Sequence, residues 1–215
     1  MMLVAALMVM LLVSALGAAL ILVTSSETTI AANFRCSLGA LYAADAAAEK
    51  ALAEVAMVAD WDQLLNGSVR SAFVDGSPVG TRMVNGTPVD LSQIVALASC
   101  HKSATCSEAE MDAVTAERPW GANNPRWQLY AYGELEDAVT GAESAYYVLV
   151  LVGDDPSESD NDPLVDGGGP DNPGAGVLLL RAQAFGPRNA HKTIEIAIAR
   201  TGSERVRLLS WRELR

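Results

Sequence analysis

The chain has 215 residues, of which 50% are apolar and only 6% aromatic, and its formal charge is −11. This acidic balance argues against nucleic acid as a partner, because contacts to phosphates need a basic surface. Motifs of hydrolases, nucleotide-binding loops and metalloproteases are absent, and there are only two histidines. We therefore expect a structural protein rather than an enzyme, with no catalytic residues and no organic cofactor.

The N-terminus is one apolar run over residues 1–23. At about 1.5 Å per helical residue it is roughly 35 Å long, enough to cross the hydrocarbon core of a bilayer. A cleaved signal peptide is the alternative, since Ala15-Leu16-Gly17 resembles a cleavage site. Signal peptides, however, have a basic start and a shorter apolar part, whereas the first cation here is Arg35. We predict an uncleaved single span over residues 1–24.

Residues 25–59 continue the helical pattern, without proline and with Gly39 as their only glycine. This composition favours one long helix through both halves. The alternative is a second helix that begins at a capping box formed by Thr24 and Glu27. The outer half is predicted to carry an apolar stripe, with one acid in it, at spacings of three or four residues. Its members are Phe34, Leu38, Leu41, Asp45, Ala48, Leu52 and Val55.

A variable region of helices and a hairpin is predicted over residues 60–126. A short helical turn over residues 60–65 comes first, and Asn66-Gly67 ends it. Residues 69–89 then have the turn chemistry of a hairpin or an extended excursion, most clearly at Asn85-Gly86.

Two further helices are predicted from their capping residues. Asp90 can cap a helix that runs to about Ala98, and Ser107 with Glu110 forms a capping box for another that ends before Pro119.

Cysteines are few. Cys100 and Cys106 lie six positions apart in a segment that we expect to be exported, where a small disulfide loop is favoured. A zinc site that also uses His101 is a weaker alternative, because a second distant ligand pair is lacking. Cys36 is interpreted as a small buried apolar side chain.

From residue 127 to 215 the hydrophobic period changes to two, which indicates strands. Glycine-rich breaks separate five of them, and the short connections favour an antiparallel meander. We predict an α+β fold in which one apolar face of this sheet packs on the outer half of a long N-terminal helix. The predicted strands are Trp127–Tyr132, Ala145–Val152, Val177–Phe185, Lys192–Arg200 and Arg205–Trp211.

An acidic loop is the sharpest local signal in the head. Carboxylates at alternating positions can converge on one calcium ion, which takes six to eight oxygen ligands. Pro163 stands where an EF-hand loop needs glycine, so that motif does not match, and a solvated loop between two strands is the alternative. The candidate ligands are Asp154, Asp155, Glu158, Asp160, Asp162 and Asp166.

The N-terminal 55 residues resemble the start of PilX-type minor pilins of type IV pili. The segments that carry the resemblance are Ser25-Ser26-Glu27-Thr28-Thr29, Ala31-Ala32-Asn33-Phe34-Arg35 and Tyr42-Ala43-Ala44-Asp45-Ala46-Ala47-Ala48-Glu49. The resemblance implies a subunit with a single span in the bacterial inner membrane and its head in the periplasm. It also implies that the apolar half-helix later packs in the core of an extracellular filament, with other pilin subunits, minor pilins or a tip adhesin as partners.

Two departures from the pilin pattern define the alternatives. Pilins carry a short basic leader that ends in glycine, so we expect either a start upstream of Met1 or a sequence close to a mature form. Major pilins have a glutamate at the fifth mature position, whereas Ala5 and Ala6 stand here. This argues against a major pilin. The alternatives are a type II secretion pseudopilin and a single-span periplasmic protein with a calcium- or ligand-binding head.

Overall fold

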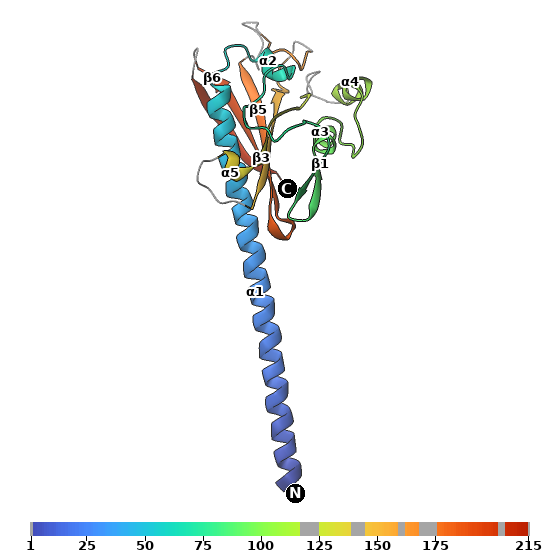
Figure 1. Cartoon of the computed structure of the whole chain (residues 1–215), viewed down its shortest axis with the longest axis vertical. Coiled ribbons are helices and arrows are strands. Elements are labelled where there is room, and N and C mark those ends of the chain that lie inside the picture. The colour runs from blue at the N-terminus through green and yellow to red at the C-terminus, as the bar shows by residue number, and fades with distance from the viewer. Residues whose placement is uncertain are drawn as a thin grey trace.

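The computed structural model describes residues 2–116, 125–138, 145–158, 162–167, 176–201 and 205–214. A long N-terminal helix, α1 (Met2–Val55), carries a globular head on its C-terminal end and projects from it as a rod (Figure 1). The head is built on a five-stranded antiparallel sheet. The α+β fold predicted from the sequence is therefore confirmed.

Helix α1 is continuous over 54 residues, which at about 1.5 Å per residue makes it roughly 80 Å long. The alternative of a second helix that begins at Thr24 is wrong. The Thr24 hydroxyl donates backward to the carbonyl oxygens of Leu20 (2.9 Å) and Ile21 (3.1 Å), as a residue inside a helix does. Without a proline or a turn residue at this point, the backbone has no reason to leave the helix.

The sheet is a meander in which each strand pairs with the next along the chain, in the order β3-β4-β5-β6-β7. All five predicted strands are present, with ends that shift by at most three residues. They are β3 (Gln128–Glu134), β4 (Tyr147–Asp154), β5 (Val177–Phe185), β6 (His191–Arg200) and β7 (Val206–Leu214). The turn helix η1 (Pro187–Asn189) joins β5 to β6, and α5 (Leu135–Ala138) follows β3.

One core lies between α1 and the sheet. The helix contributes small residues, so that its backbone approaches the strands closely, and the sheet contributes the β-branched and leucine side chains of β4, β5 and β6. The buried helix residues are Ala40, Ala43, Ala44, Ala47, Ala48, Ala51 and Val55.

The predicted apolar stripe is therefore only partly correct. Ala48 and Val55 are buried, but Leu41 and Leu52 are half-buried at the margin of the contact, and Phe34 is 69% exposed. Large side chains on this face would hold the sheet away, whereas alanines let it come close.

A second core covers the opposite face of the sheet. The hairpin of β1 (Thr81–Val84) and β2 (Thr87–Asp90), together with α3 (Leu91–Cys100), packs on alternate side chains of β3 and β4. Val148, Val150 and Val152 belong to the core under α1, and Tyr147, Leu149 and Leu151 belong to the second core. The predicted apolar face toward α1 is thus only one of two buried faces at β4, which is buried throughout.

The remaining elements begin and end at the residues expected from their caps. Short helix α2 (Asp62–Leu65) ends at Asn66, and the β1–β2 turn has positive φ at Asn85 and Gly86. The Asp90 carboxylate accepts a hydrogen bond from the Gln93 N–H (3.1 Å). Helix α4 (Glu108–Ala116) starts from the predicted capping box, in which the Ser107 N–H donates to Glu110 (2.9 Å).

Candidate functional site

The projecting half of α1 has a long exposed apolar surface. Residues 2–31 are all exposed. The helix holds an 18-residue window of mean hydropathy 2.8, none of which is buried. By length and composition, α1 is able to cross a membrane. Exposed apolar surfaces of this size are typical of sites that contact a membrane or another protein.

Hydroxyl side chains follow the apolar run, and those of the threonines donate to carbonyl oxygens of the same helix. Thr28 donates to the carbonyl oxygens of Thr24 (3.0 Å) and Ser25 (2.9 Å), and Thr29 donates to that of Ser25 (2.9 Å). Because these threonine hydroxyls bond to their own helix, they need no further partner where this segment lies at a membrane boundary or against another helix.

The head is fixed to the helix where α1 enters it. Tyr146, just before β4, donates from its hydroxyl to the carbonyl oxygen of Cys36 (3.2 Å). Its ring fits between Gly39 on α1 and Gly186 after β5, and a β-carbon at either glycine would collide with it. Two glycines far apart in sequence thus form the slot for one aromatic ring, and only glycine fits there.

Polar contacts fix the head further along the helix. The Trp211 indole N–H on β7 donates to the Asp45 carboxylate (3.0 Å), and the Tyr130 hydroxyl on β3 donates to Glu54 (3.3 Å). Burial, with Glu54 beside it, raises the pKa of Tyr130 above its ordinary value, so the phenol stays neutral. Asp45, the acid within the predicted apolar stripe, therefore has a partner on the sheet.

The C-terminal end of α1 has a contact of its own. The Arg200 guanidinium lies 4.3 Å from the centroid of the Trp61 ring and donates to the carbonyl oxygens of Val58 (3.2 Å) and Ala59. The Trp61 indole N–H donates to the Val55 carbonyl oxygen (3.3 Å). The Val55 carbonyl oxygen also accepts from the Val58 N–H (3.1 Å), and the carbonyls of Val58 and Ala59 lie just beyond α1, so these contacts hold the chain where it leaves the helix.

The acidic loop uses several of its carboxylates to organise its own backbone. Asp155 accepts from the Ser157 N–H (3.0 Å), and Asp162 accepts from the Leu164 N–H (3.1 Å). Glu158 is buried and accepts from the Gly167 N–H (3.0 Å). These bonds fold the loop back on itself.

Two other carboxylates also accept hydrogen bonds from backbone N–H groups, at the start of the loop and just before β5. Buried Asp154 accepts from the Asp155 N–H (2.9 Å), and Asp166 accepts from the Gly176 N–H (2.6 Å). Asp160 lies outside the described residues. Within the described ranges, no group of three acids, histidines or cysteines is placed to hold a metal ion. Calcium binding by this loop stays a prediction.

Cys100 and Cys106 come together at the end of α3, with their sulfur atoms at bonding distance and their Cα atoms 6.2 Å apart. The adjacent His101 is exposed and has positive φ, and its N–H donates to the Leu97 carbonyl oxygen (3.1 Å) to end the helix. This geometry supports the predicted disulfide. Cys36 is partly buried and has a free thiol.

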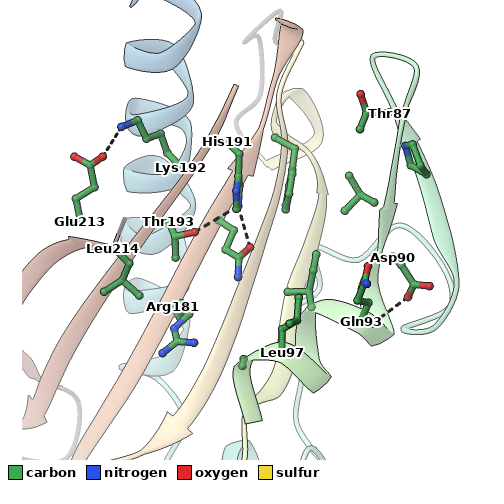
Figure 2. A pocket seen from close by; sticks show the side chains of 16 residues that line it. Thr87, Asp90, Gln93, Leu97, Arg181, His191, Lys192, Thr193, Glu213 and Leu214 are labelled. Carbon is green, nitrogen blue, oxygen red and sulfur yellow. Dashed lines mark hydrogen bonds and ion pairs between the residues drawn. The ribbon is translucent and has the colours of Figure 1, made fainter. Parts of the chain in front are cut away.

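A groove of about 620 Å³ separates α3 and β2 from the sheet (Figure 2). One wall is apolar, with Ile94 and Leu97 from α3, and the floor is polar, with Arg181 and Thr193 from the sheet. His191 stacks on Phe185 (4.4 Å between ring centroids), and its Nε2 lies 3.1 Å from the Gln183 amide oxygen. The residue is exposed as a whole, but burial of its ring lowers the pKa of His191, which favours the neutral imidazole. Nothing in the sequence pattern indicated this groove.

Comparisons with known proteins give no match: no protein-family model, no curated protein and no solved structure matches the chain. Function is therefore inferred from the geometry above.

Proposed function

We propose that the chain is a minor pilin-like structural subunit of a type IV pilus, of the PilX type. The observation that carries this proposal is the division of α1: its outer half is packed on the head, whereas residues 2–31 are exposed and the apolar run over residues 1–23 makes up most of them. One rigid helix can thus anchor the subunit in the membrane and later pack among the helices of a filament, while its head stays outside.

Small residues along the exposed half support close packing between helices. Gly17, for example, has nothing within 4 Å of the place where a β-carbon would stand, apart from its chain neighbours and the backbone of its own helix. Small side chains let the backbones of neighbouring helices approach each other, which favours association in lipid and in a filament core. The small residues of this half are Ala5, Ala6, Ala15, Gly17, Ala18 and Ala19.

The composition of the apolar run supports a minor rather than a major subunit. Residues Ala5 and Ala6 place no carboxylate in the apolar run that could neutralise a neighbour's N-terminus. Such a subunit is placed in the bacterial inner membrane before assembly, with its head in the periplasm, and in the extracellular filament afterwards. Its partners are then other pilins, minor pilins or a tip adhesin.

The test is the mass of the N-terminus of the protein extracted from membranes of its native host, expressed from the full genomic locus. We expect a terminus trimmed after a leader glycine and carrying a methyl group, and we expect the same subunit in sheared filaments. The control is a strain without the leader peptidase, in which the terminus stays untrimmed. An unmodified terminus in the normal strain contradicts the proposal.

A single-span periplasmic protein with a ligand-binding head is the second candidate, and the groove between α3 and the sheet favours it. In that case the terminus is unmodified and the protein is absent from filaments.

A type II secretion pseudopilin shares the trimmed terminus. The two filament systems are therefore distinguished by identifying the partners that are cross-linked to the free Cys36 thiol.

A further inference from the structure

The two edges of the sheet differ. The outer edge of β3 is covered by residues 71–75, which run beside it. The Ser71 N–H donates to Tyr130 O, the Asp75 N–H donates to Tyr132 O, and the Tyr132 N–H donates to Phe73 O, each at 3.1 Å. The backbone groups of Tyr130 and Tyr132 that face this edge are therefore occupied.

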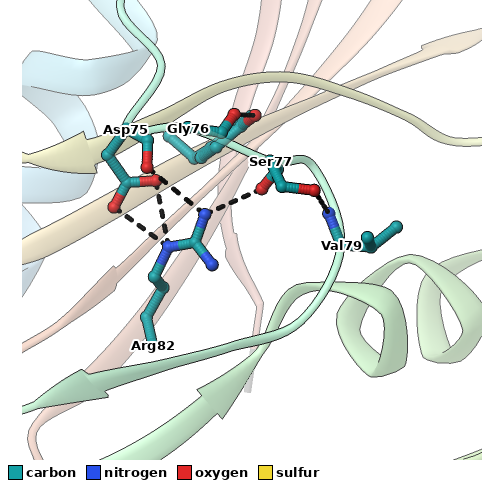
Figure 3. A network of polar contacts seen from close by, with 6 residues as sticks. Asp75, Gly76, Ser77, Val79 and Arg82 are labelled. Atoms are coloured by element: carbon teal, nitrogen blue, oxygen red, sulfur yellow. Dashed lines mark hydrogen bonds and ion pairs between the residues drawn. The ribbon is translucent and has the colours of Figure 1, made fainter.

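Side chains hold this covering segment in place (Figure 3). Arg82 on β1 donates from Nε to the Asp75 carboxylate (3.1 Å) and from Nη2 to the Ser77 carbonyl oxygen (2.7 Å). The Tyr132 hydroxyl donates to the Gly76 carbonyl oxygen (2.7 Å). This edge of the sheet is closed to another strand.

The outer edge of β7 has no such cover: within the described ranges, β7 pairs with β6 alone. The strand is nine residues long, and Leu208, Leu209 and Trp211 are 48%, 44% and 45% exposed. A long edge strand with exposed apolar side chains is a template for another strand, and proteins ordinarily protect such edges. Here one edge is protected and the other is not.

The register of β7 against β6 gives the uncovered edge two chemically different faces. Leu208 and Trp211 pair with Ile198 and Ile196, so they lie on the face toward α1. Arg207 and Arg212 pair with Ala199 and Glu195, so they lie on the opposite face. A bulge at Leu209, between the pairs of Leu208 and Ser210, keeps this division along the strand.

The arginine face carries positive charge in a chain whose formal charge is −11. Arg207 is exposed. Arg212 donates from Nε to Glu195 (3.0 Å), but its side chain is 65% exposed, so part of its guanidinium faces solvent. Glu195 also forms an ion pair with Arg181, with 2.7 Å between Arg181 Nη2 and Glu195 Oε2, so its charge is shared between two arginines. Acidic side chains on an incoming strand would therefore find opposite charge here.

We propose that β7 is an acceptor edge for an extended segment of a partner protein. That segment alternates apolar side chains, which pack beside Leu208 and Trp211, with acidic side chains, which face Arg207 and Arg212. It adds a sixth strand to the sheet, with main-chain hydrogen bonds for affinity and alternate side chains for specificity.

A second copy of this chain does not fit the edge. Two β7 strands that pair antiparallel are related by a twofold axis perpendicular to them, and this axis reverses the direction of α1, which lies along the sheet (Figure 1). The two N-terminal halves would then point in opposite directions, which copies anchored in one membrane cannot do. The exclusion of a second copy rests on the proposed membrane anchorage. The argument from the uncovered β7 edge and its arginines does not.

The test uses the full chain in detergent micelles and a fluorescein-labelled nine-residue peptide that alternates valine and glutamate. Fluorescence anisotropy should show saturable binding, and a peptide that alternates valine and lysine should bind weaker by roughly tenfold or more. No binding of the glutamate peptide at millimolar concentration, or equal affinity for both peptides, overturns the proposal. Because no filament or membrane is needed, this result is independent of the proposed pilus function.

Two versions of the glutamate peptide, N-methylated at odd or at even positions, test the strand pairing itself. One version loses the N–H groups that face β7 and should not bind, while the other should. Equal behaviour of the two overturns strand addition.

Charge reversal tests the arginine face. Arg207→Glu should weaken binding of the glutamate peptide and strengthen binding of the lysine peptide. Arg70→Glu makes the same change at an exposed position away from β7 and should leave both affinities unchanged. Equal effects of the two variants, or dimers of the full chain that Arg207→Glu dissociates, also overturn the proposal.

Discussion

Tyr146 and Gly39 fit together so closely that the phenol oxygen occupies the space where a β-carbon at position 39 would stand. The only glycine of the outer half of α1 is therefore a packing requirement, although glycine weakens a helix.

We expect Gly39→Ala to lower the free energy of unfolding of the head by about 1–3 kcal/mol, because the added methyl group forces Tyr146 or the helix to move. The measurement is thermal unfolding of the full chain in detergent, followed by tryptophan fluorescence. Gly17→Ala is the matched control, since a β-carbon there meets nothing, and it should gain roughly 0.5–1 kcal/mol of helix stability or leave the head unchanged. A Gly39→Ala chain as stable as the parent would show that the Tyr146 slot is loose.

The two sulfurs at the end of α3 should behave differently from Cys36. Iodoacetamide should label Cys36 in the untreated protein, and Cys100 and Cys106 only after reduction, because a disulfide has no thiolate to react. Mass spectrometry of peptides from the protein exported by its host gives the answer. Labelling of Cys100 before reduction would rule out the disulfide.

Glu110 gives helix α4 a defined dependence on pH. The Lys102 ammonium, and then the Ser107 N–H and hydroxyl, hold the pKa of its carboxyl at about 2, below the ordinary 4.5. Since this value is lower in the folded than in the unfolded chain, the capping box stabilises α4 fully above about 4.5 and loses this effect as pH falls toward 2. We expect an NMR titration of the Glu110 carboxyl to have its midpoint near the lower value.

The matched variant is Lys102→Met, which should raise the Glu110 midpoint because the first donor is gone while Ser107 remains. A midpoint near 4.5 in the unaltered chain would mean that the capping box does not form in solution.

Calcium separates the two interpretations of the acidic loop. If the ion binds the native state, millimolar calcium should raise the melting temperature of the head, and Asp160→Ala combined with Asp162→Ala should abolish the rise. Magnesium at the same concentration is the control, because it prefers a smaller octahedral site. An unchanged melting temperature would contradict calcium binding. The carboxylates would then serve as hydrogen-bond acceptors for the loop backbone, as Asp155 and Asp162 do in the structure.

Local signals in the sequence were sufficient for most of the fold. Period-two hydrophobicity located all five strands, and side chains that bond to nearby backbone, such as Asp90 and the Ser107–Glu110 pair, located the helix starts. These signals are local, since a cap and its partner lie three residues apart, and they hold whatever the rest of the chain does.

The side of α1 that meets the sheet was harder to predict. Hydrophobicity alone favoured the face with Phe34, Leu41 and Leu52. The sheet packs instead on the adjoining face with Ala44 and Ala47, because small side chains let the strands come closer to the helix. The alanines were visible in the sequence, but their use depends on the shape of the opposing sheet. For the same reason the groove beneath α3 and the uncovered edge of β7 had no signature, because each depends on residues distant in sequence.

The unbroken course of α1 makes it a lever. With its outer half fixed to the sheet by Tyr146, Trp211 and Tyr130, a tilt of a few degrees at the head moves the far N-terminus by several ångströms over a rod roughly 80 Å long. Whatever holds the apolar half therefore sets the direction in which the groove and the β7 edge point. Ile30→Pro would kink or break α1 between its two halves, so the head would stay folded but could change its orientation relative to the N-terminal half.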